Sequence, residues 1–130
     1  MDKVYDLLKS SKVFFFATVN GDKPVIRPFG AVTRHGGKLY ICTNSKKKVY
    51  AQIGANHAIA IAAMTPDGGW FRLSATAVLD SSPESIDAML TENPMLKGMY
   101  LGNPDFATLY LKDVVAEISD ADNEQTFLKF

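Results

Sequence analysis

The sequence predicts a mainly β protein, a small antiparallel β-barrel with short helices between the strands. Segments rich in β-branched and aromatic residues are separated by tight turns that contain Gly, Asn or Pro, a pattern typical of hairpin-linked strands. The helical patterns are short and do not alternate with the strands, as a parallel α/β sheet would require. The length of 130 residues, with 47% hydrophobic and 22% charged side chains, fits one domain over residues 1–130.

The first half of the chain is predicted to hold one helix and three strands. The pair Asn20-Gly21 favours a tight hairpin turn because such turns need positive φ angles. Pro28 cannot donate a ladder hydrogen bond, so its strand should be an edge strand or bulged. The predicted elements are a helix at Val4–Lys9, a buried strand at Val13–Val19, its partner at Pro24–Thr33 and a third strand at Leu39–Thr43.

The rest of the chain is predicted to hold two short helices and three apolar strands. Ser82 and Pro83 are typical of the first positions of a helix. The stretch Asn93–Asn103 shows no regular pattern. The predicted elements are helices at Lys47–Ile53 and Ser82–Leu90 and strands at His57–Met64, Trp70–Leu79 and Phe106–Ile118.

Composition argues against several classes of function. The formal net charge is zero, which is unlike a general nucleic-acid binder. A single cysteine, Cys42, rules out an internal disulfide, and no signal peptide or membrane-spanning stretch is evident. We therefore expect a cytoplasmic protein that binds neither nucleic acid nor membrane. No Cys/His cluster has metal-ligand spacing, so no metal site is expected.

The segment Thr43-Asn44-Ser45-Lys46-Lys47-Lys48 is predicted to bind phosphate. It lies where a strand ends and a helix begins, and helix N-termini carry unpaired N–H groups and partial positive charge. Lysines at that end are unfavourable unless an anion is present, while Thr43, Asn44 and Ser45 add polar groups. A solvated lysine-rich turn is the alternative.

Two further features support a ligand site. Arg27 lies in an apolar strand without an acidic residue within four positions on its own strand face, so its partner is a distant group or a ligand. Trp70 and Arg72 share one face of an alternating strand, which suits a planar aromatic ligand. The alternative for these two is a core or interface tryptophan with an arginine at the rim.

Taken in order, several motifs resemble the pyridoxamine 5'-phosphate oxidase-like family of FMN-binding split barrels, and in particular its small bacterial members grouped with nitroimidazole-resistance proteins. The resemblance covers residues 10–80 best. The motifs that carry it are Ala17–Gly21, Pro24–Phe29, Leu39–Asn44, Lys47–Gln52 and Gly69–Leu73.

This resemblance implies a homodimer with FMN at the subunit interface. It implies that Arg27 and the segment Ser45–Lys47 bind the FMN phosphate, with Lys47 favoured and Lys46 second. It also implies that Cys42 and Thr43, with the neighbouring Asn44, line the cofactor site. The backbone at Pro28 and Phe29 would face the isoalloxazine ring, and Trp70 and Arg72 would shape its pocket.

The resemblance leads us to expect an FMN-dependent oxidoreductase that passes electrons or hydride to a small-molecule acceptor. The sequence names neither the donor nor the acceptor. No arginine follows Arg72, whereas true oxidases of this type use a C-terminal arginine motif for the substrate phosphate, so pyridoxamine phosphate oxidation is not expected. The alternative is a non-catalytic protein that binds or senses FMN, haem or a pyridoxal-type ligand.

Overall fold

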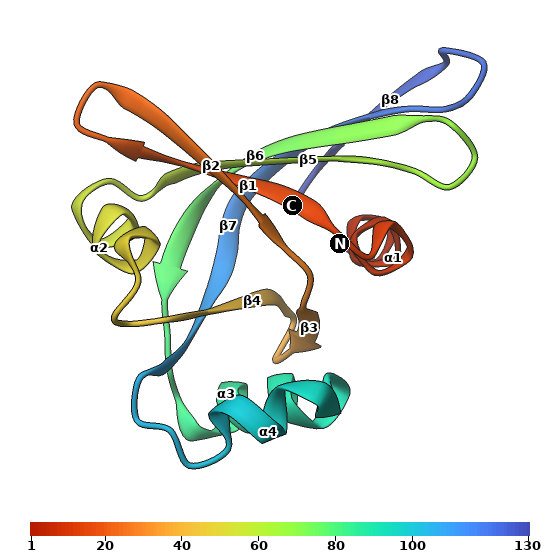
Figure 1. Cartoon of the computed structure of the whole chain (residues 1–130). Coiled ribbons are helices and arrows are strands. Elements are labelled where there is room, and N and C mark those ends of the chain that lie inside the picture. Colours follow the sequence, from red (N-terminus) through yellow and green to blue (C-terminus); the bar gives the residue numbers. More distant parts are fainter.

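The computed structural model describes all 130 residues and contains one antiparallel sheet of eight strands with helices at its ends (Figure 1). The strand order is β2-β1-β5-β6-β7-β4-β3, and β8 pairs with β7. This confirms the predicted mainly β architecture. In chain order the elements are α1 (Asp2–Ser11), β1 (Phe14–Asn20), β2 (Lys23–Phe29), β3 (Val32–His35), β4 (Lys38–Asn44), α2 (Lys48–Ala55), β5 (Ala58–Met64), β6 (Trp70–Leu79), α3 (Pro83–Glu92), η1 (Pro94–Leu96), α4 (Lys97–Tyr100), β7 (Phe106–Ser119) and β8 (Gln125–Lys129).

Strand β7 joins the two parts of the sheet. One of its edges pairs with β6, and the other pairs first with β4 and then with β8. A β-bulge lies between these two stretches, where Asp113 has a φ of 54° and Val114 exchanges two backbone hydrogen bonds with Phe130. Bulges bend and twist a strand. Because of this bend, β7 pairs with both β4 and β8 along the same edge.

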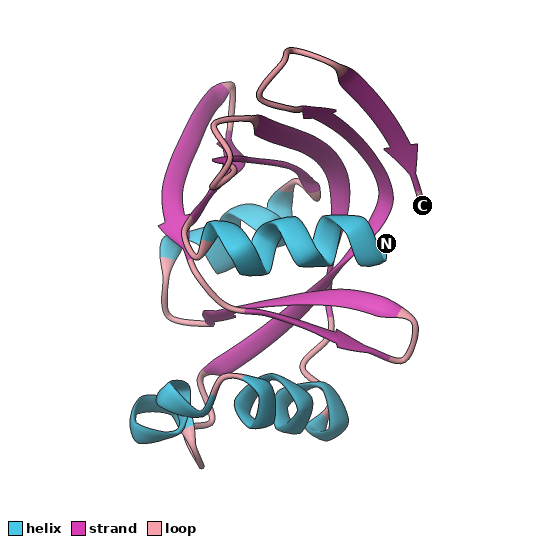
Figure 2. Cartoon of the chain, turned by 90° about the vertical axis from the view of Figure 1, so that its right-hand side faces the viewer, coloured by secondary structure: helices cyan, strands magenta, loops and turns pink.

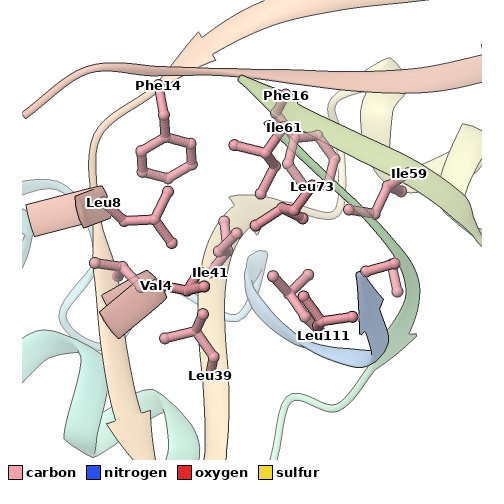
Figure 3. Close-up of a cluster of buried hydrophobic side chains, with 14 of the residues drawn as sticks. Val4, Leu8, Phe14, Phe16, Leu39, Ile41, Ile59, Ile61, Leu73 and Leu111 are labelled. Atoms are coloured by element: carbon pink, nitrogen blue, oxygen red, sulfur yellow. The ribbon is translucent and has the colours of Figure 1, made fainter. Parts of the chain in front are cut away.

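Helix α1 fills the space between the curved strands and the β3–β4 hairpin (Figure 2). Val4 and Leu8 are fully buried and point among residues of several strands, including Phe14 and Ile41 (Figure 3). A 3.6-residue period places positions 4 and 8 on one face of a helix. Burying an apolar side chain of this size contributes about 1.5–3 kcal/mol, so α1 is part of the core. No helix of the chain is long and apolar enough to cross a membrane.

The strand predicted at Pro24–Thr33 is wrong as a single element. The structure breaks it into β2, which pairs with β1, and β3, which pairs with β4. The chain passes between the two at Gly30, where an added Cβ would lie 3.2 Å from the carbonyl oxygen of Lys12. Periodicity cannot reveal this change of partner, because the mostly apolar run Pro24–Val32 continues through the break at Gly30. β2 is an edge strand of the sheet, as Pro28 predicted.

Other boundaries also differ from the expectations. The first helix is longer than Val4–Lys9, and β1 alternates between buried and exposed residues, with Phe15 46% exposed. The irregular stretch Asn93–Asn103 contains η1 and α4, and β8 was not predicted. The predicted turn at Gly21 is confirmed, with a φ of 66° between the paired residues Asn20 and Lys23.

A hydrogen-bond network around Glu92 ties α1 and β3 to α3. The carboxylate accepts hydrogen bonds from the Tyr5 hydroxyl at 2.6 Å and the Thr33 hydroxyl at 2.7 Å, and Lys9 Nζ lies 2.7 Å away. Burial raises the pKa of Glu92, but the interactions with Lys9, Tyr5 and Thr33 outweigh this effect and hold the pKa below its ordinary value. The network therefore favours the ionised carboxylate in the folded protein.

We predict that Glu92→Gln lowers the free energy of unfolding at pH 7 by about 1–3 kcal/mol, because charged hydrogen bonds are lost. A lowered pKa stabilises the fold above the ordinary glutamate pKa, and this contribution disappears as the pH falls through the folded-state pKa. The difference between wild type and Glu92→Gln, measured by urea unfolding, should thus shrink below about pH 4. Asp87→Asn, on an exposed side of α3, is the control and should change little. A Glu92→Gln difference that is constant with pH would contradict the assignment.

Candidate functional site

A cavity of about 550 Å³ lies where α1, the β2–β3 connection, the end of β4 and the α3–α4 region meet. Its volume is within the usual range for small-molecule sites. Half of the lining residues are hydrophobic, and the others are three lysines, Thr43, Asn93, Pro28 and Gly30. The lining residues are Lys9, Lys12, Pro28, Phe29, Gly30, Ala31, Cys42, Thr43, Lys47, Asn93, Met95, Leu96, Met99 and Tyr100.

The lining carries positive charge and no acidic side chain. Lys9 and Lys12 reach it from the end of α1, and Lys47 reaches it from the start of α2. Lys9 forms an ion pair with Glu92, whereas neither Lys12 nor Lys47 takes part in an ion pair. A concave site with unpaired cations favours an anionic ligand.

Thr43 places an unsatisfied polar atom beside this cavity. The residue lies near the end of β4 and is 5% exposed, and its Oγ1 has no hydrogen-bond partner. Most buried polar side-chain atoms in folded proteins are hydrogen-bonded, because burial without a partner is costly. A ligand acceptor or donor in the cavity would satisfy this hydroxyl once the Thr43 side chain turns toward it, because the oxygen itself exposes less than 1 Å². This observation bears directly on ligand binding.

The turn between β4 and α2 is held by hydrogen bonds that its backbone N–H groups donate. The N–H of Ser45 donates to the Asp105 carbonyl at 2.8 Å, the N–H of Lys46 donates to Asn44 Oδ1 at 2.8 Å, and the N–H of Lys47 donates to the Asn44 carbonyl at 2.9 Å. Asn44 and Ser45 therefore shape the turn, and their side chains do not line the cavity.

Lys46, Lys47 and Lys48 were expected in the first turn of the helix, and this prediction is wrong for Lys46 and Lys47. Lys46 precedes the helix, Lys47 is its N-cap with extended backbone angles, and only Lys48 lies in α2. The unfavourable helix-dipole interaction is thus limited to fewer lysines than expected. Of the three, Lys47 alone lines the cavity.

Cys42 lines the cavity as a neutral thiol. Burial raises its pKa to about 12, and attraction to Lys47 offsets this only in part. A thiol with such a pKa carries almost no thiolate at neutral pH and is a poor nucleophile. Cys42 therefore contributes shape and polarisability to the site.

Arg27 lies outside the cavity lining. Its Nη1 donates to the Phe16 carbonyl oxygen at 3.1 Å and its Nη2 donates to Gln52 Oε1 at 2.9 Å, which ties β2 to α2. Burial lowers the pKa of Arg27, although a guanidinium stays protonated. Its partners are thus a carbonyl and an amide, and a role in phosphate binding stays a prediction.

As expected, Trp70 and Arg72 share one face of β6. Within one chain, however, neither residue lines the cavity. The Arg72 guanidinium lies 5.3 Å from the Trp70 ring centroid, and its Nε donates to Glu117 Oε2 at 2.9 Å. Arg72 lines a different hollow of about 420 Å³ on the outer face of the sheet.

That outer face is apolar and exposed. Phe15, Ile26, Val115 and Phe127, which we call the apolar face, are between 43% and 64% exposed. Ile26 and Pro28 are two positions apart on β2 and so point to the same side. Because Pro28 also lines the cavity, the apolar face and the cavity are continuous along β2.

Several lining residues were missed from the sequence. Lys12 lies beyond the expected end of the first helix, and Asn93, Met95, Met99 and Tyr100 belong to the stretch without a regular pattern. Nothing local marks them, because only the packing of α1 and α4 around the ends of β2 and β4 brings them together.

Comparisons with known proteins identify the family. A family model described as pyridoxamine 5'-phosphate oxidase matches residues 1–119. The crystal structure of a NimC/NimA family protein from Clostridium acetobutylicum is 35% identical, with a TM-score of 0.96 over 100% of this chain and 92% of that one. No curated protein matches the chain.

More distant structures share the fold alone. A putative pyridoxamine 5'-phosphate oxidase from Listeria innocua is 21% identical, with a TM-score of 0.66 over 87% of this chain and 94% of that one. A haem-binding protein from Mycobacterium smegmatis is 16% identical, with a TM-score of 0.77 over 95% of this chain and 55% of that one. The matching family model and the shared antiparallel architecture together establish that the chain belongs to the pyridoxamine 5'-phosphate oxidase family of split barrels.

Proposed function

We propose that the protein is an FMN-binding flavoprotein that acts as an oxidoreductase on a small molecule. The observation that carries this proposal is the buried, unpartnered Thr43 hydroxyl beside a cavity with unpaired lysines and no acidic side chain. A phosphate monoester carries two charges and several acceptor oxygens, so it complements these groups. Family membership supports FMN as the ligand with that phosphate.

The phosphate end of the site is assigned to the end of β4 and the start of α2. Lys47 supplies a cation, Thr43 supplies a hydroxyl donor, and the first backbone N–H groups of α2 add partial positive charge. Arg27 strengthens this end indirectly, since its bond to Gln52 holds α2 against β2. Lys46 and Ser45 keep the turn that presents Lys47.

The flavin ring is assigned to the apolar part of the lining. Phe29, Leu96 and Tyr100 provide flat or aliphatic surface, and the backbone at Pro28 borders the same space. The flavin itself supplies the electron-transfer chemistry when bound, while the protein supplies position and polarity. A catalytic acid or base in the lining is therefore not required.

The same lining gives less support to haem. It contains no histidine, and its one cysteine is held as a neutral thiol. Haem iron in proteins is most often held by histidine or by a thiolate. A non-catalytic FMN binder differs from an oxidoreductase only in turnover. Anaerobic mixing of FMN-loaded protein with NADH or NADPH separates the two, since bleaching of the flavin absorption and its recovery with an acceptor indicate turnover.

We predict that Lys47→Ala weakens FMN binding by roughly 10–150-fold, as expected for the loss of a charge-assisted contact of about 1.5–3 kcal/mol. Affinity is measured by titrating the apoprotein with FMN and following flavin fluorescence. Lys38→Ala, which removes a lysine outside the cavity, is the control and should bind FMN like wild type. Equal affinity of the two variants would refute the phosphate assignment, and failure of the wild type to bind FMN would refute the function.

Thr43→Val gives a sharper prediction, because its effects on stability and binding should separate. The hydroxyl has no partner in the free protein, so its removal should leave the free energy of unfolding unchanged or raise it by about 0.5–1 kcal/mol. FMN affinity should nevertheless fall about tenfold, because the hydroxyl is expected to bond to the phosphate. Loss of stability without loss of FMN affinity would show that Thr43 has a structural partner instead.

We further propose that two copies associate through the apolar face and that FMN lies at the edge of their interface. Exposed apolar groups of this extent usually mark an interaction surface, and the face runs along β2 into the cavity. An interface there would place Arg72, which lines the hollow of that face, and the neighbouring Trp70 against the partner chain, which agrees with the place in the flavin pocket that the family resemblance implies for both residues.

The dimer is tested by placing a charge on the apolar face. Phe15→Glu should convert the protein from twice the chain mass to a monomer in sedimentation equilibrium, since an unpaired buried charge is strongly unfavourable. FMN affinity should fall in the same variant. Leu101→Glu, which alters an apolar residue that is 69% exposed and does not line the hollow of this face, is the control. A wild-type protein that sediments as a monomer would contradict the proposal.

A further inference from the structure

Lys12 has an unusual backbone for a lysine. It is the C-cap residue of α1 and has a φ of 64° and a ψ of −47°, so it is the central residue of a γ-turn in which the N–H of Val13 donates to the Ser11 carbonyl at 2.7 Å. A side chain with a Cβ is strained there, and glycine would end the helix with less strain. The lysine is therefore not explained by the helix end alone.

The position of Lys12 depends on Gly30. The Lys12 carbonyl oxygen packs so closely against Gly30 that an added Cβ would lie 3.2 Å away. This contact brings the end of α1 against the connection between β2 and β3. As a result the Lys12 side chain lines the same cavity as Phe29 and Gly30, and it comes from a different part of the chain than Lys47, which precedes α2.

The three lysines of the cavity differ in their available charge. Lys9 is neutralised by Glu92, whose carboxylate lies 2.7 Å from its Nζ. Lys47 follows β4 and is assigned to the FMN phosphate under the proposed function. Lys12 has no ion pair and no side-chain hydrogen bond, and no acidic residue lines the cavity. One cation therefore remains after the cofactor phosphate is accommodated.

We propose that Lys12 binds the anionic group of the second substrate, so that the molecule that exchanges electrons with the flavin is a small planar organic acid. This inference rests on the proposed function. The apolar groups of Met95 and Met99 form part of the same lining and accommodate the planar body of such a molecule. Carboxylates and phosphate esters both satisfy an ammonium group, so both classes are included.

The test uses the FMN-loaded protein and a matched pair of probes. Oxidised holoprotein is titrated with 4-hydroxybenzoate and with 4-hydroxybenzamide, which have the same shape but differ in charge, and binding is followed by the change in flavin absorbance. We expect the carboxylate to bind at least tenfold more tightly than the amide. Phenyl phosphate is titrated in parallel, and the tighter of the two anions identifies the preferred class.

Three variants assign the preference to Lys12. Lys12→Met should remove the carboxylate preference, and Lys12→Arg should retain it. Lys12→Gly should also remove the carboxylate preference. It should raise the melting temperature, because glycine relieves the strain of the positive φ at this position. Loss of the preference in Lys12→Gly therefore cannot be attributed to misfolding. Lys3→Met, which removes a lysine from the same helix outside the cavity, should behave like wild type.

The outcomes separate this inference from the proposed function. Wild-type protein that binds no FMN overturns both. Wild-type protein that binds FMN but shows no preference for the carboxylate overturns the inference alone. An FMN affinity that falls in Lys12→Met as much as in Lys47→Ala also overturns it, because Lys12 would then belong to the flavin phosphate. An unchanged FMN affinity with a lost carboxylate preference establishes it.

Discussion

The shape of the whole molecule depends on the pairing of β7 with three other strands. Its bulge at Asp113 lets β4 and β8 follow one another along a single edge while β6 holds the other. That bend carries the end of β4 away from the strands in the other half of the sheet. The separation leaves room for α1 between the two halves. Thr43 and the β4–α2 turn therefore end up opposite the end of α1, and the cavity lies between these elements.

The electrostatics of the site follow from the same arrangement. Glu92 joins α1, β3 and α3 through its contacts with Tyr5, Lys9 and Thr33, and it also removes one cation from the cavity. The two lysines that remain lie on different elements, Lys12 at the end of α1 and Lys47 before α2. A ligand with two separated anionic or polar ends, or two ligands together, suits such a site better than a single small anion. We propose accordingly that Lys47 holds the cofactor phosphate and that Lys12 holds the anionic group of the substrate.

Much of the fold was accessible from the sequence, because alternation and turn residues are local signals. Residues Trp70–Leu79 were assigned to a strand with correct ends, and Ser82 caps α3 through a bond from the Ser85 N–H. The division of residues 24–33 into β2 and β3 was not accessible, since a change of strand partner leaves the apolar pattern intact. Strand β8 was missed because it gains its order from pairing with β7.

For the candidate site, the sequence by itself indicated the family and an anion-binding segment. It pointed to Thr43 and Lys47 because a strand end followed by lysines and a helix start is a local pattern. Only the tertiary structure decided which groups share one cavity. It placed Arg27 against Gln52, set Arg72 on the opposite face, and brought Lys12 to the site. The physical reason is that the side-chain environment is set by contacts between distant segments, such as Lys12 against Gly30, which no local periodicity encodes.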